Sequence, residues 1–463
     1  MTQPLFTLDA ILAATGGRAT GVTAKSINSI SIDSREIGPD ALFVAIKGDR
    51  FDGHDFVDTA LTNGAAAALV SHGEGDNRIT VPDALGGLVD LARAARARSR
   101  ALIVGVTGSV GKTTTKEALR VVFEAAGETH ASIRSFNNHW GVPLMLARMP
   151  ETAQFGVFEM GMNAPDEIRP LSQLVRPHIA VITTVAPAHL EKLGSIEAIA
   201  HAKAEIFDGL ETGGTAVINA DHPQITQLLE AAAAAGVARV VTFGFSRGVD
   251  WQIIEAETAG DRSFATVLNG DQRHALAIGV AGRHMLSNAT AALAVASLAG
   301  IEPETALRAL ASFGPQPGRG QRIHLGAGET PLLLIDESYN ANTASIAAAL
   351  DVFGAVSAPN GKKFVVLGDM LELGEAGPAL HAGLADAVRA SGADAVYLVG
   401  TNMAHLHNAL ASGPFSQHFT GVDEAMPELL AALAYGDAVM VKGSNGVGLS
   451  RLVAAIKDKF QQR

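Results

Sequence analysis

The stretch Val104-Gly105-Val106-Thr107-Gly108-Ser109-Val110-Gly111-Lys112-Thr113-Thr114 is the most informative segment of this 463-residue chain. It continues the apolar run Ala101–Val104, which predicts a buried strand, and it leads into a helical pattern over Lys112–Ala126. A strand, a glycine-rich turn and a helix N-terminus together form an anion site, because the loop N–H groups and the helix dipole attract negative charge. The segment therefore predicts a phosphate-binding loop composed of Gly108, Ser109, Val110, Gly111, Lys112, Thr113 and Thr114.

Two side chains of this loop have expected roles toward a nucleoside triphosphate. Lys112 would reach the outer phosphates, and the Thr113 hydroxyl would hold a Mg²⁺ ion. The strict pattern G-x-x-x-x-G-K-[ST] is not met, since Val106 stands five positions before Gly111. The alternative is a glycine turn that caps an ordinary helix, but the flanking strand and helix are those that nucleotide binding requires.

The composition places the chain among globular α/β proteins. Hydrophobic residues make up 48% and charged residues 18%, and a chain of this length predicts several domains. The net charge of −12 disfavours broad binding to nucleic acid or to an anionic membrane. The absence of cysteine excludes disulfides and thiolate metal sites, and no apolar stretch is long enough to cross a bilayer. We expect no membrane insertion, no nucleic-acid partner and a cytoplasmic location.

Strand and helix patterns divide the chain into three α/β segments. Residues 1–99 predict a small module of their own. Residues 100–313 alternate strands with helices, which implies a mostly parallel sheet, and Trp251–Ile278 suggests an antiparallel addition. The run Phe313–Gly320 is rich in Pro and Gly and predicts a linker. Residues 314–463 then predict a second doubly wound unit without a phosphate loop.

Polar side chains follow several predicted strands, at the edge where such sheets bind ligands. Glu159 could hold Mg²⁺, or be a solvated acid at a strand end. His189 could be a ligand or a proton-transfer group, or a surface residue. Lys203, taken alone, is a solvated helix lysine. The run Asp336–Asn342 predicts either a ligand-facing loop or an Asx-rich turn that caps the helix from Thr343.

Together these segments resemble the Mur ligase family. The match rests on the phosphate loop and on five further runs, which are Asn137-Asn138-His139-Trp140-Gly141-Val142-Pro143, Glu159-Met160-Gly161-Met162-Asn163, Ala186-Pro187-Ala188-His189-Leu190-Glu191, Asp336-Glu337-Ser338-Tyr339-Asn340-Ala341-Asn342 and Val441-Lys442-Gly443-Ser444. The resemblance extends from Asp33 to Ser444, and the order of the runs is specific to the family.

The resemblance implies a fold and a reaction. It implies a UDP-sugar-binding domain at 1–99, a central ATP-binding domain at 100–313 and a Rossmann-like domain at 314–463 that binds the incoming amine. In this family ATP phosphorylates a substrate carboxylate, and the amine then attacks the acyl phosphate. The run Ser338–Asn342 points to the branch that adds D-alanyl-D-alanine to UDP-N-acetylmuramoyl-tripeptide in peptidoglycan precursor synthesis.

The same resemblance implies roles for individual residues. Lys112, Glu159, His189 and Lys203 would be catalytic, and Thr113, Glu159, His189 and Lys203, the last as a carbamate, would hold Mg²⁺. Asn288 and Asp336 would contact ATP, as would an arginine of the linker region, for which Arg319 and Arg322 compete. The substrate-binding candidates are Ser34 and Arg35, which from their residue types could take a phosphate, together with Asn137, Asn138, Tyr339, Asn340, Asn342, Lys442 and Ser444.

Several alternatives stay open from the sequence. A related ligase, such as a sibling Mur enzyme or a folylpolyglutamate synthetase, would share this framework. A phosphate-loop switch that makes no product is a rival from another class, although it would not need the polar loops of 314–463. Asn445 stands where related enzymes often carry Arg, which bears on how a carboxylate is held. The sequence does not choose lysine or diaminopimelate as the third acceptor residue, and we expect a monomer.

Overall fold

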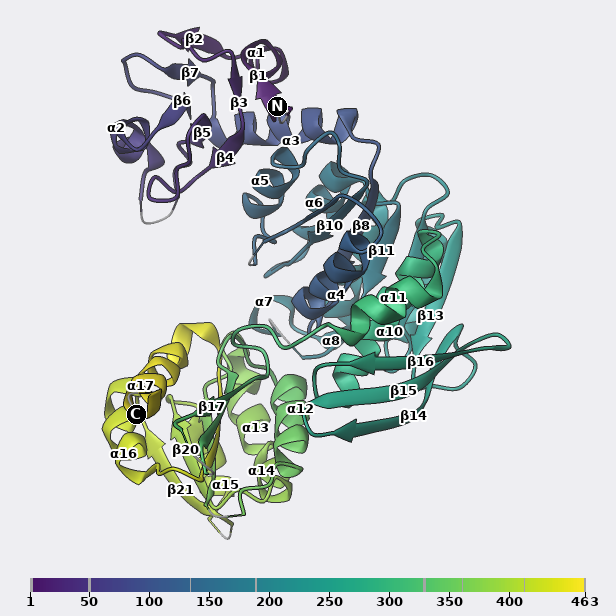
Figure 1. The fold of residues 1–463 in the computed structure, drawn as a ribbon, viewed down its shortest axis with the longest axis vertical. Helices are drawn as coiled ribbons and strands as arrows, with labels where there is room; N and C mark the ends of the chain where they lie inside the picture. The colour runs from purple at the N-terminus through teal and green to yellow at the C-terminus, as the bar shows by residue number, and fades with distance from the viewer. Residues whose placement is uncertain are drawn as a thin grey trace.

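The computed structural model describes residues 3–48, 51–133, 135–187, 190–327, 330–359, 361–411 and 413–461. Within these residues the three large sheets are formed by strands between 18 and 80, between 102 and 278, and between 321 and 442. Each sheet thus lies inside one of the three segments expected from the sequence, and the three follow one another along the molecule (Figure 1). The α/β fold class is confirmed. Among the described residues, no helix is both long and apolar enough to cross a membrane.

The first segment is a five-stranded sheet with helices packed against it. The strand order is β2 (Arg18–Thr20), β7 (Arg78–Thr80), β6 (Ala65–Val70), β5 (Ala41–Val44) and β4 (Ser29–Ser31), and only β2 runs antiparallel to its neighbour. The accompanying elements are β1 (Phe6–Thr7), α1 (Leu8–Thr15), β3 (Ser26–Ile27), α2 (Val57–Thr62) and α3 (Ala84–Arg98). Asp83 caps α3 by accepting from the Gly86 N–H.

The central sheet is parallel over most of its width and ends in an antiparallel hairpin. Its order is β16 (Gln272–Ile278), β15 (Arg262–Asn269), β14 (Trp251–Ala259), β13 (Arg239–Gly244), β12 (Thr215–Asn219), β11 (Ile179–Ile182), β8 (Leu102–Thr107), β10 (Phe155–Glu159) and β9 (Thr129–Ala131). The β14–β15 and β15–β16 pairs are antiparallel, which confirms the expected addition. The other neighbours are parallel.

Helices cover both faces of this sheet, as the alternating pattern predicts. One face packs against α4 (Lys112–Glu124), α10 (Arg283–Leu298) and α11 (Pro303–Ala311). The other packs against α5 (Gly141–Ala147), α6 (Ile168–Val175), α8 (Ile196–Ala204) and α9 (Ile225–Ala234). The apolar core of that second face is continuous with the core of the first segment, because α3 packs on α5.

One expected helix ends earlier than its pattern suggests. The helix expected over Ile196–Leu210 stops at Ala204 and continues as a 3₁₀ turn over Glu205–Gly209. The Glu205 carboxylate accepts hydrogen bonds from the N–H groups of Asp166, Ile168 and Arg169, at 2.7 to 3.1 Å. The Glu205 side chain therefore stabilises the N-terminal end of α6 by accepting from backbone N–H groups there.

The third segment is a six-stranded sheet between two helical layers. The order is β17 (Gln321–Leu325), β18 (Leu332–Glu337), β22 (Ala438–Lys442), β19 (Lys363–Gly368), β20 (Ala395–Val399) and β21 (Phe415–Phe419), and only β17 is antiparallel. The helices are α12 (Thr343–Gly354), α13 (Gly377–Ala382), α14 (Ala385–Ala390) and α15 (Met403–Ala409) on one face, and α16 (Val422–Ala432) and α17 (Leu449–Gln461) on the other.

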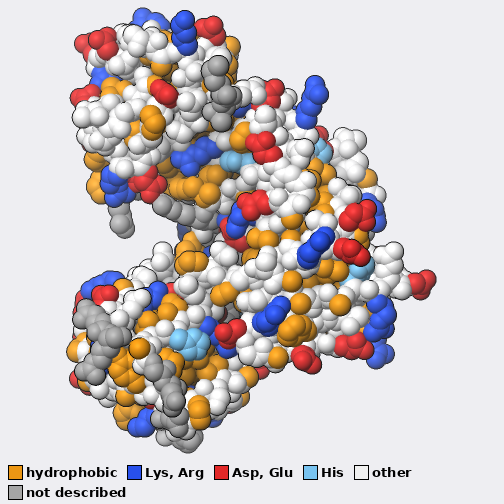
Figure 2. Space-filling view, in the orientation of Figure 1, with side chains coloured by type: hydrophobic (Ala, Val, Ile, Leu, Met, Phe, Trp, Pro, Cys, Tyr) orange, Lys and Arg blue, Asp and Glu red, His pale blue; other side chains and the backbone are white. Residues whose placement is uncertain are grey.

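The two junctions between segments differ in character. The first junction has an apolar core reinforced by buried Arg96, whose Nε donates to Val175 O at 2.7 Å. The third segment has separate apolar cores, and its contacts with the central segment include Arg322 with Asp261 and the Tyr339 hydroxyl with Ser135. A wide opening separates the first and third segments on the face shown in Figure 2.

Candidate active site

The stretch quoted at the outset forms a strand, a tight loop and a helix. Two glycines are required in the loop. Gly108 has φ +147°, and a Cβ there would overlap the Thr183 hydroxyl. Gly111 has φ +86°, and its Cβ would lie 2.5 Å from Asn288 Oδ1. A side chain at either position would also have a strained backbone. The expectation of a strand followed by a glycine loop and a helix is confirmed.

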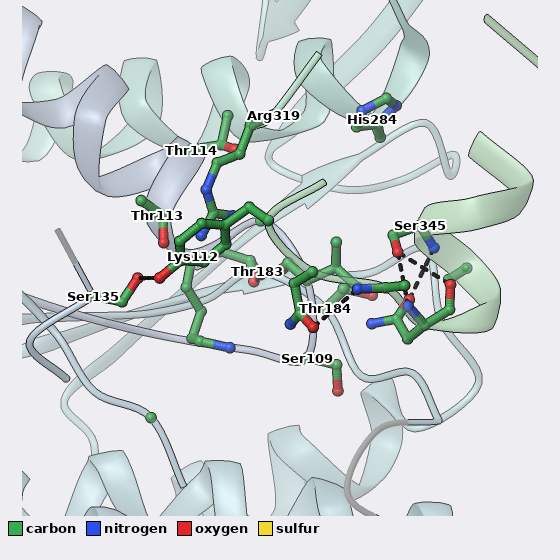
Figure 3. A pocket seen from close by; sticks show the side chains of 18 of the residues that line it. Ser109, Lys112, Thr113, Thr114, Ser135, Thr183, Thr184, His284, Arg319 and Ser345 are labelled. Carbon is green, nitrogen blue, oxygen red and sulfur yellow. Dashed lines mark hydrogen bonds between the residues drawn. The ribbon is translucent and has the colours of Figure 1, made fainter. Parts of the chain in front are cut away.

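This loop opens into a pocket of about 610 Å³ between the central and third segments (Figure 3). The loop residues Ser109–Thr114 line it, and they lie at the carboxyl edge of the central sheet. The third segment lines it with Arg319, with residues following β18 and β19, and with residues following β22. The carboxyl ends of two sheets therefore face one space, which is where α/β proteins bind ligands.

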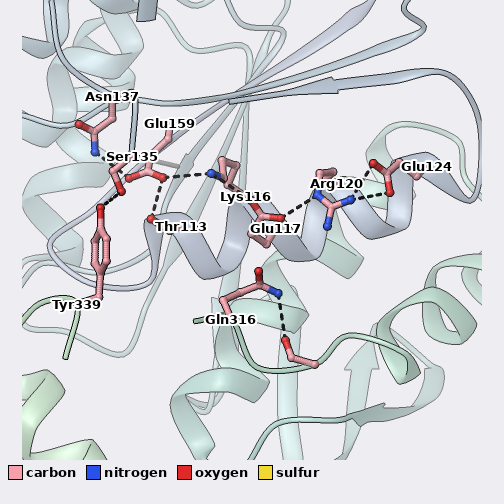
Figure 4. A network of polar contacts seen from close by, with 11 residues as sticks. Thr113, Lys116, Glu117, Arg120, Glu124, Ser135, Asn137, Glu159, Gln316 and Tyr339 are labelled. Atoms are coloured by element: carbon pink, nitrogen blue, oxygen red, sulfur yellow. Dashed lines mark hydrogen bonds and ion pairs between the residues drawn. The ribbon is translucent and has the colours of Figure 1, made fainter. Parts of the chain in front are cut away.

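Glu159 lines this pocket and is the centre of a polar network (Figure 4). The carboxylate is 1% exposed and accepts from Thr113 Oγ1 at 2.8 Å and from Asn137 Nδ2 at 2.8 Å. Lys116, which is fully buried, places its Nζ 3.9 Å from Glu159 Oε2 and 3.1 Å from Glu117 Oε1. A carboxylate beside a hydroxyl offers the oxygen ligands that Mg²⁺ prefers.

Two lysines with lowered pKa values lie near this network. Lys112 Nζ donates to Gly108 O at 2.7 Å. Burial lowers the pKa of Lys112, with Glu159 opposing and Arg319 reinforcing that shift. Lys203 is 2% exposed, so the reading as a solvated helix lysine is wrong. Burial, followed by repulsion from Lys112, holds the pKa of Lys203 well below its usual range. His189 lies outside the described residues.

The linker arginines are separated by the structure. Arg319 lines the pocket, and its guanidinium lies 4.2 Å from the centre of the Tyr339 ring. Arg322 is not part of the pocket lining and forms an ion pair with Asp261 of the central segment. The geometry therefore favours Arg319 for a phosphate contact.

The loop after β18 differs in part from expectation. Asp336 is buried away from the pocket lining, and its Oδ1 accepts from the backbone N–H and the hydroxyl of Ser338. Glu337, which the sequence reasoning did not select, lines the pocket instead. Successive strand residues point to opposite sides, so a shift of one position exchanges the two carboxylates.

The remaining candidates of the third segment line the pocket, and they also form hydrogen bonds or ion pairs within that segment. Asn342 caps α12 through reciprocal hydrogen bonds with Ser345, which bears out the capping alternative for this residue. Lys442 Nζ lies 3.2 Å from Glu337 Oε2 and donates to Asn340 O at 3.0 Å. The Ser444 hydroxyl accepts from Leu371 N, and Asn445 lines the pocket beside it.

The candidates for sugar-nucleotide binding do not all meet. Asn137 and Asn138 line the pocket, and Asn138 Oδ1 accepts from Gly141 N. Ser34 and Arg35 are in the first segment, away from the pocket. The Arg35 side chain is 85% exposed and pairs with Asp33. Ser34 is buried. The pair Asn137 and Asn138 therefore lies at the pocket, and the pair Ser34 and Arg35 lies elsewhere.

Sequence reasoning missed several pocket residues. They lie at the last residue of a strand, within two residues after a strand, or at the start of a helix, and they are Thr183, Asn219, Asp221, Phe245 and His284. The signal that could have found Asn219 and Asp221 is the one used for Glu159, a polar residue at a strand's carboxyl end. Phe245 carries no such signal.

Comparison with known sequences finds three family models, and one matches within each of the three segments. Residues 26–95 match the model described as Mur ligase family, catalytic domain. Residues 106–296 match the Mur ligase middle domain, and 318–445 match the Mur ligase, glutamate ligase domain. The chain is 32% identical to UDP-N-acetylmuramoyl-tripeptide–D-alanyl-D-alanine ligase of Rickettsia prowazekii, over 92% of this chain and 94% of that protein. It is 33% identical to the enzyme of the same name from Bacillus subtilis, over 92% of each.

Solved structures agree with these relatives. MurF from Acinetobacter baumannii superposes with a TM-score of 0.85 at 29% identity, covering 98% of this chain and 99% of that one. MurF from Thermotoga maritima, solved in complex with ADP, gives a TM-score of 0.79 at 27% identity, covering 94% and 98%. The chain therefore belongs to the Mur ligase family.

Proposed function

We propose that this chain is the ATP-dependent ligase that joins D-alanyl-D-alanine to UDP-N-acetylmuramoyl-tripeptide. The products would be the pentapeptide precursor of peptidoglycan, ADP and phosphate. The curated relatives carry this activity in their names over nearly the full chain. The observation that supports it most directly is the phosphate loop, which opens into a pocket that the third segment also lines.

The pocket supplies what phosphoryl transfer requires. That reaction depends on positioning and on neutralising charge more than on covalent help from the protein. Lys112 and Arg319 reach the same space from two domains, and the N-terminus of α4 adds its dipole. These groups would hold the triphosphate while its outer phosphoryl group is transferred to the substrate carboxylate.

The donor set fits a magnesium ion. Thr113 Oγ1 and Glu159 Oε2 are oxygen donors 2.8 Å apart, and Asn137 orients the other carboxylate oxygen. When bound, Mg²⁺ would neutralise charge on the phosphates. Lys203 would join this set only as a carbamate. That modification requires a neutral amine, and the burial that lowers the Lys203 pKa supports one.

The second half of the reaction needs a site that excludes water, because an acyl phosphate hydrolyses easily. The Tyr339 hydroxyl bonded to Ser135 holds the third segment against the central one at the pocket. Tyr339, Asn340, Asn342, Lys442 and Ser444 would surround the incoming dipeptide. The sugar nucleotide would reach the pocket from the first segment, where Ser34 and Arg35 lie.

The test is phosphate release from ATP with Mg²⁺ and the sugar-nucleotide tripeptide, measured with and without D-alanyl-D-alanine. Release should require the dipeptide. Equal release in its absence would remove the ligase assignment and favour a nucleotide switch. A panel of other amine acceptors separates sibling ligases. Lys112→Ala should lower kcat on the order of 10²-fold or more, whereas Lys25→Ala, an exposed lysine of the first segment, should not.

A further inference from the structure

A row of contacts follows the pocket wall away from the phosphate loop. Gly111 of the loop lies against the Asn288 amide. Ser287, the residue before it on α10, accepts from Asn219 Nδ2 at 3.3 Å. Asn219 Oδ1 in turn accepts from Asp221 N at 2.8 Å. All five residues line the pocket. The row begins at Gly111 in the phosphate loop, and Asp221 lies at its other end.

Asp221 fixes an aromatic side chain at that end. Its Oδ2 accepts from Phe245 N at 2.8 Å, and its Oδ1 accepts from Ser246 N at 2.9 Å and from Ser246 Oγ at 2.8 Å. Gly244 has φ +146°, and a Cβ there would lie 2.5 Å from Asp221 Oδ1. One carboxylate thus determines where Phe245 stands.

The Phe245 ring is half-buried and lines the pocket. The Arg283 guanidinium lies 4.0 Å from its centre and covers part of the ring. The third segment adds Ala344 and Ala348 to the same lining, one helical turn apart on α12. The side chains of Ala344 and Ala348 are small, so this part of the lining leaves space for a flat ligand.

We propose that Phe245 stacks against the base of ATP, with Ala344 and Ala348 keeping the space beside it open. This inference rests on the proposed function for the identity of the nucleotide. Stacking of a base on an aromatic side chain is a recurrent and substantial source of affinity. The uracil of the sugar nucleotide is the other available base, but the wall that ends at Phe245 begins at the phosphate loop.

The experiment measures equilibrium binding by calorimetry for the native chain, Phe245→Ala and Phe245→Trp, with Mg-ATP and with Mg-tripolyphosphate. Phe245→Ala should weaken ATP on the order of tenfold and leave tripolyphosphate unchanged, and Phe245→Trp should restore ATP binding. Ala348→Leu should also weaken ATP alone, because its side chain would fill the space. Phe415→Ala, at an exposed phenylalanine of β21, is the matched control.

Three results would overturn the inference. ATP affinity could be unchanged in Phe245→Ala with a native melting temperature. Tripolyphosphate affinity could fall as much as that of ATP, which would mean that the loop itself moved. The KM for the sugar nucleotide could rise while that for ATP does not, which would assign the slot to uracil. Dipeptide-dependent phosphate release by the native enzyme tests the proposed function separately, so the two failures are distinguishable.

Discussion

Gly111→Ala should disable nucleotide use through a displacement of less than 1 Å. At φ +86° an alanine costs about 1–2 kcal/mol of backbone strain. Its Cβ would also lie 2.5 Å from Asn288 Oδ1, whereas ordinary contact begins at 3.4 Å, so the loop or the amide must move by about 0.9 Å. Misplacement by about 1 Å lowers turnover on the order of 10²-fold. We therefore expect a loss of that size in kcat/KM for ATP.

Gly213 provides a matched control. It has φ +82°, and a Cβ there would have nothing within 4 Å. Gly213→Ala should thus show the strain without the collision, with a melting temperature lower by about 2–4 °C and native kinetics. Steady-state phosphate release over a range of ATP concentrations measures both variants. If Gly111→Ala keeps half the native kcat/KM, or if Gly213→Ala loses as much, the collision argument is refuted.

Three further outcomes are expected. Lys203→Ala should lose nearly all turnover and regain part of it with bicarbonate or a small carboxylate; a native rate would rule out a carbamate. Arg319→Ala should lower kcat on the order of 10²-fold, whereas Arg322→Ala, which removes a contact with the central segment, should stay near native in the same assay. Burial lowers the pKa of His130 to about 4 from 6.5, so its folded state resists protonation. The contribution of neutral, buried His130 to the free energy of unfolding should be fully present above about pH 6.5. It should decline as the pH falls toward 4. Urea unfolding at pH 7 and pH 5 should show a smaller decline for His130→Gln, and an equal decline would contradict it.

Local pattern was sufficient for most of the fold. The strands of the central sheet are buried runs of Val, Ile and Ala, and α4 follows its loop, so these elements were predictable. The edge strands β17 and β21 were not predicted. The β21 run Phe415–Phe419 is only partly buried and contains polar residues, so its strand form depends on pairing with β20.

The site was predictable where chemistry is concentrated in one run. The phosphate loop, Glu159 and Lys203 were found from the sequence or the family resemblance, and they lie near one another, with Glu159 and Lys203 buried. The choice between Arg319 and Arg322 depended on which of the two side chains faces the pocket. That is a property of the tertiary structure. Phe245 could not be selected, because its position is determined by Asp221, far from it along the chain.

Because the two junctions differ, we expect the molecule to have fewer cooperative unfolding units than it has segments. The first and central segments share one continuous apolar core, so neither can lose its packing without exposing the other. The third segment has apolar cores of its own, separate from that shared core, so its disruption should leave the shared core intact. Substitutions that destabilise residues 314–463 should accordingly have little effect on the stability of the first two segments.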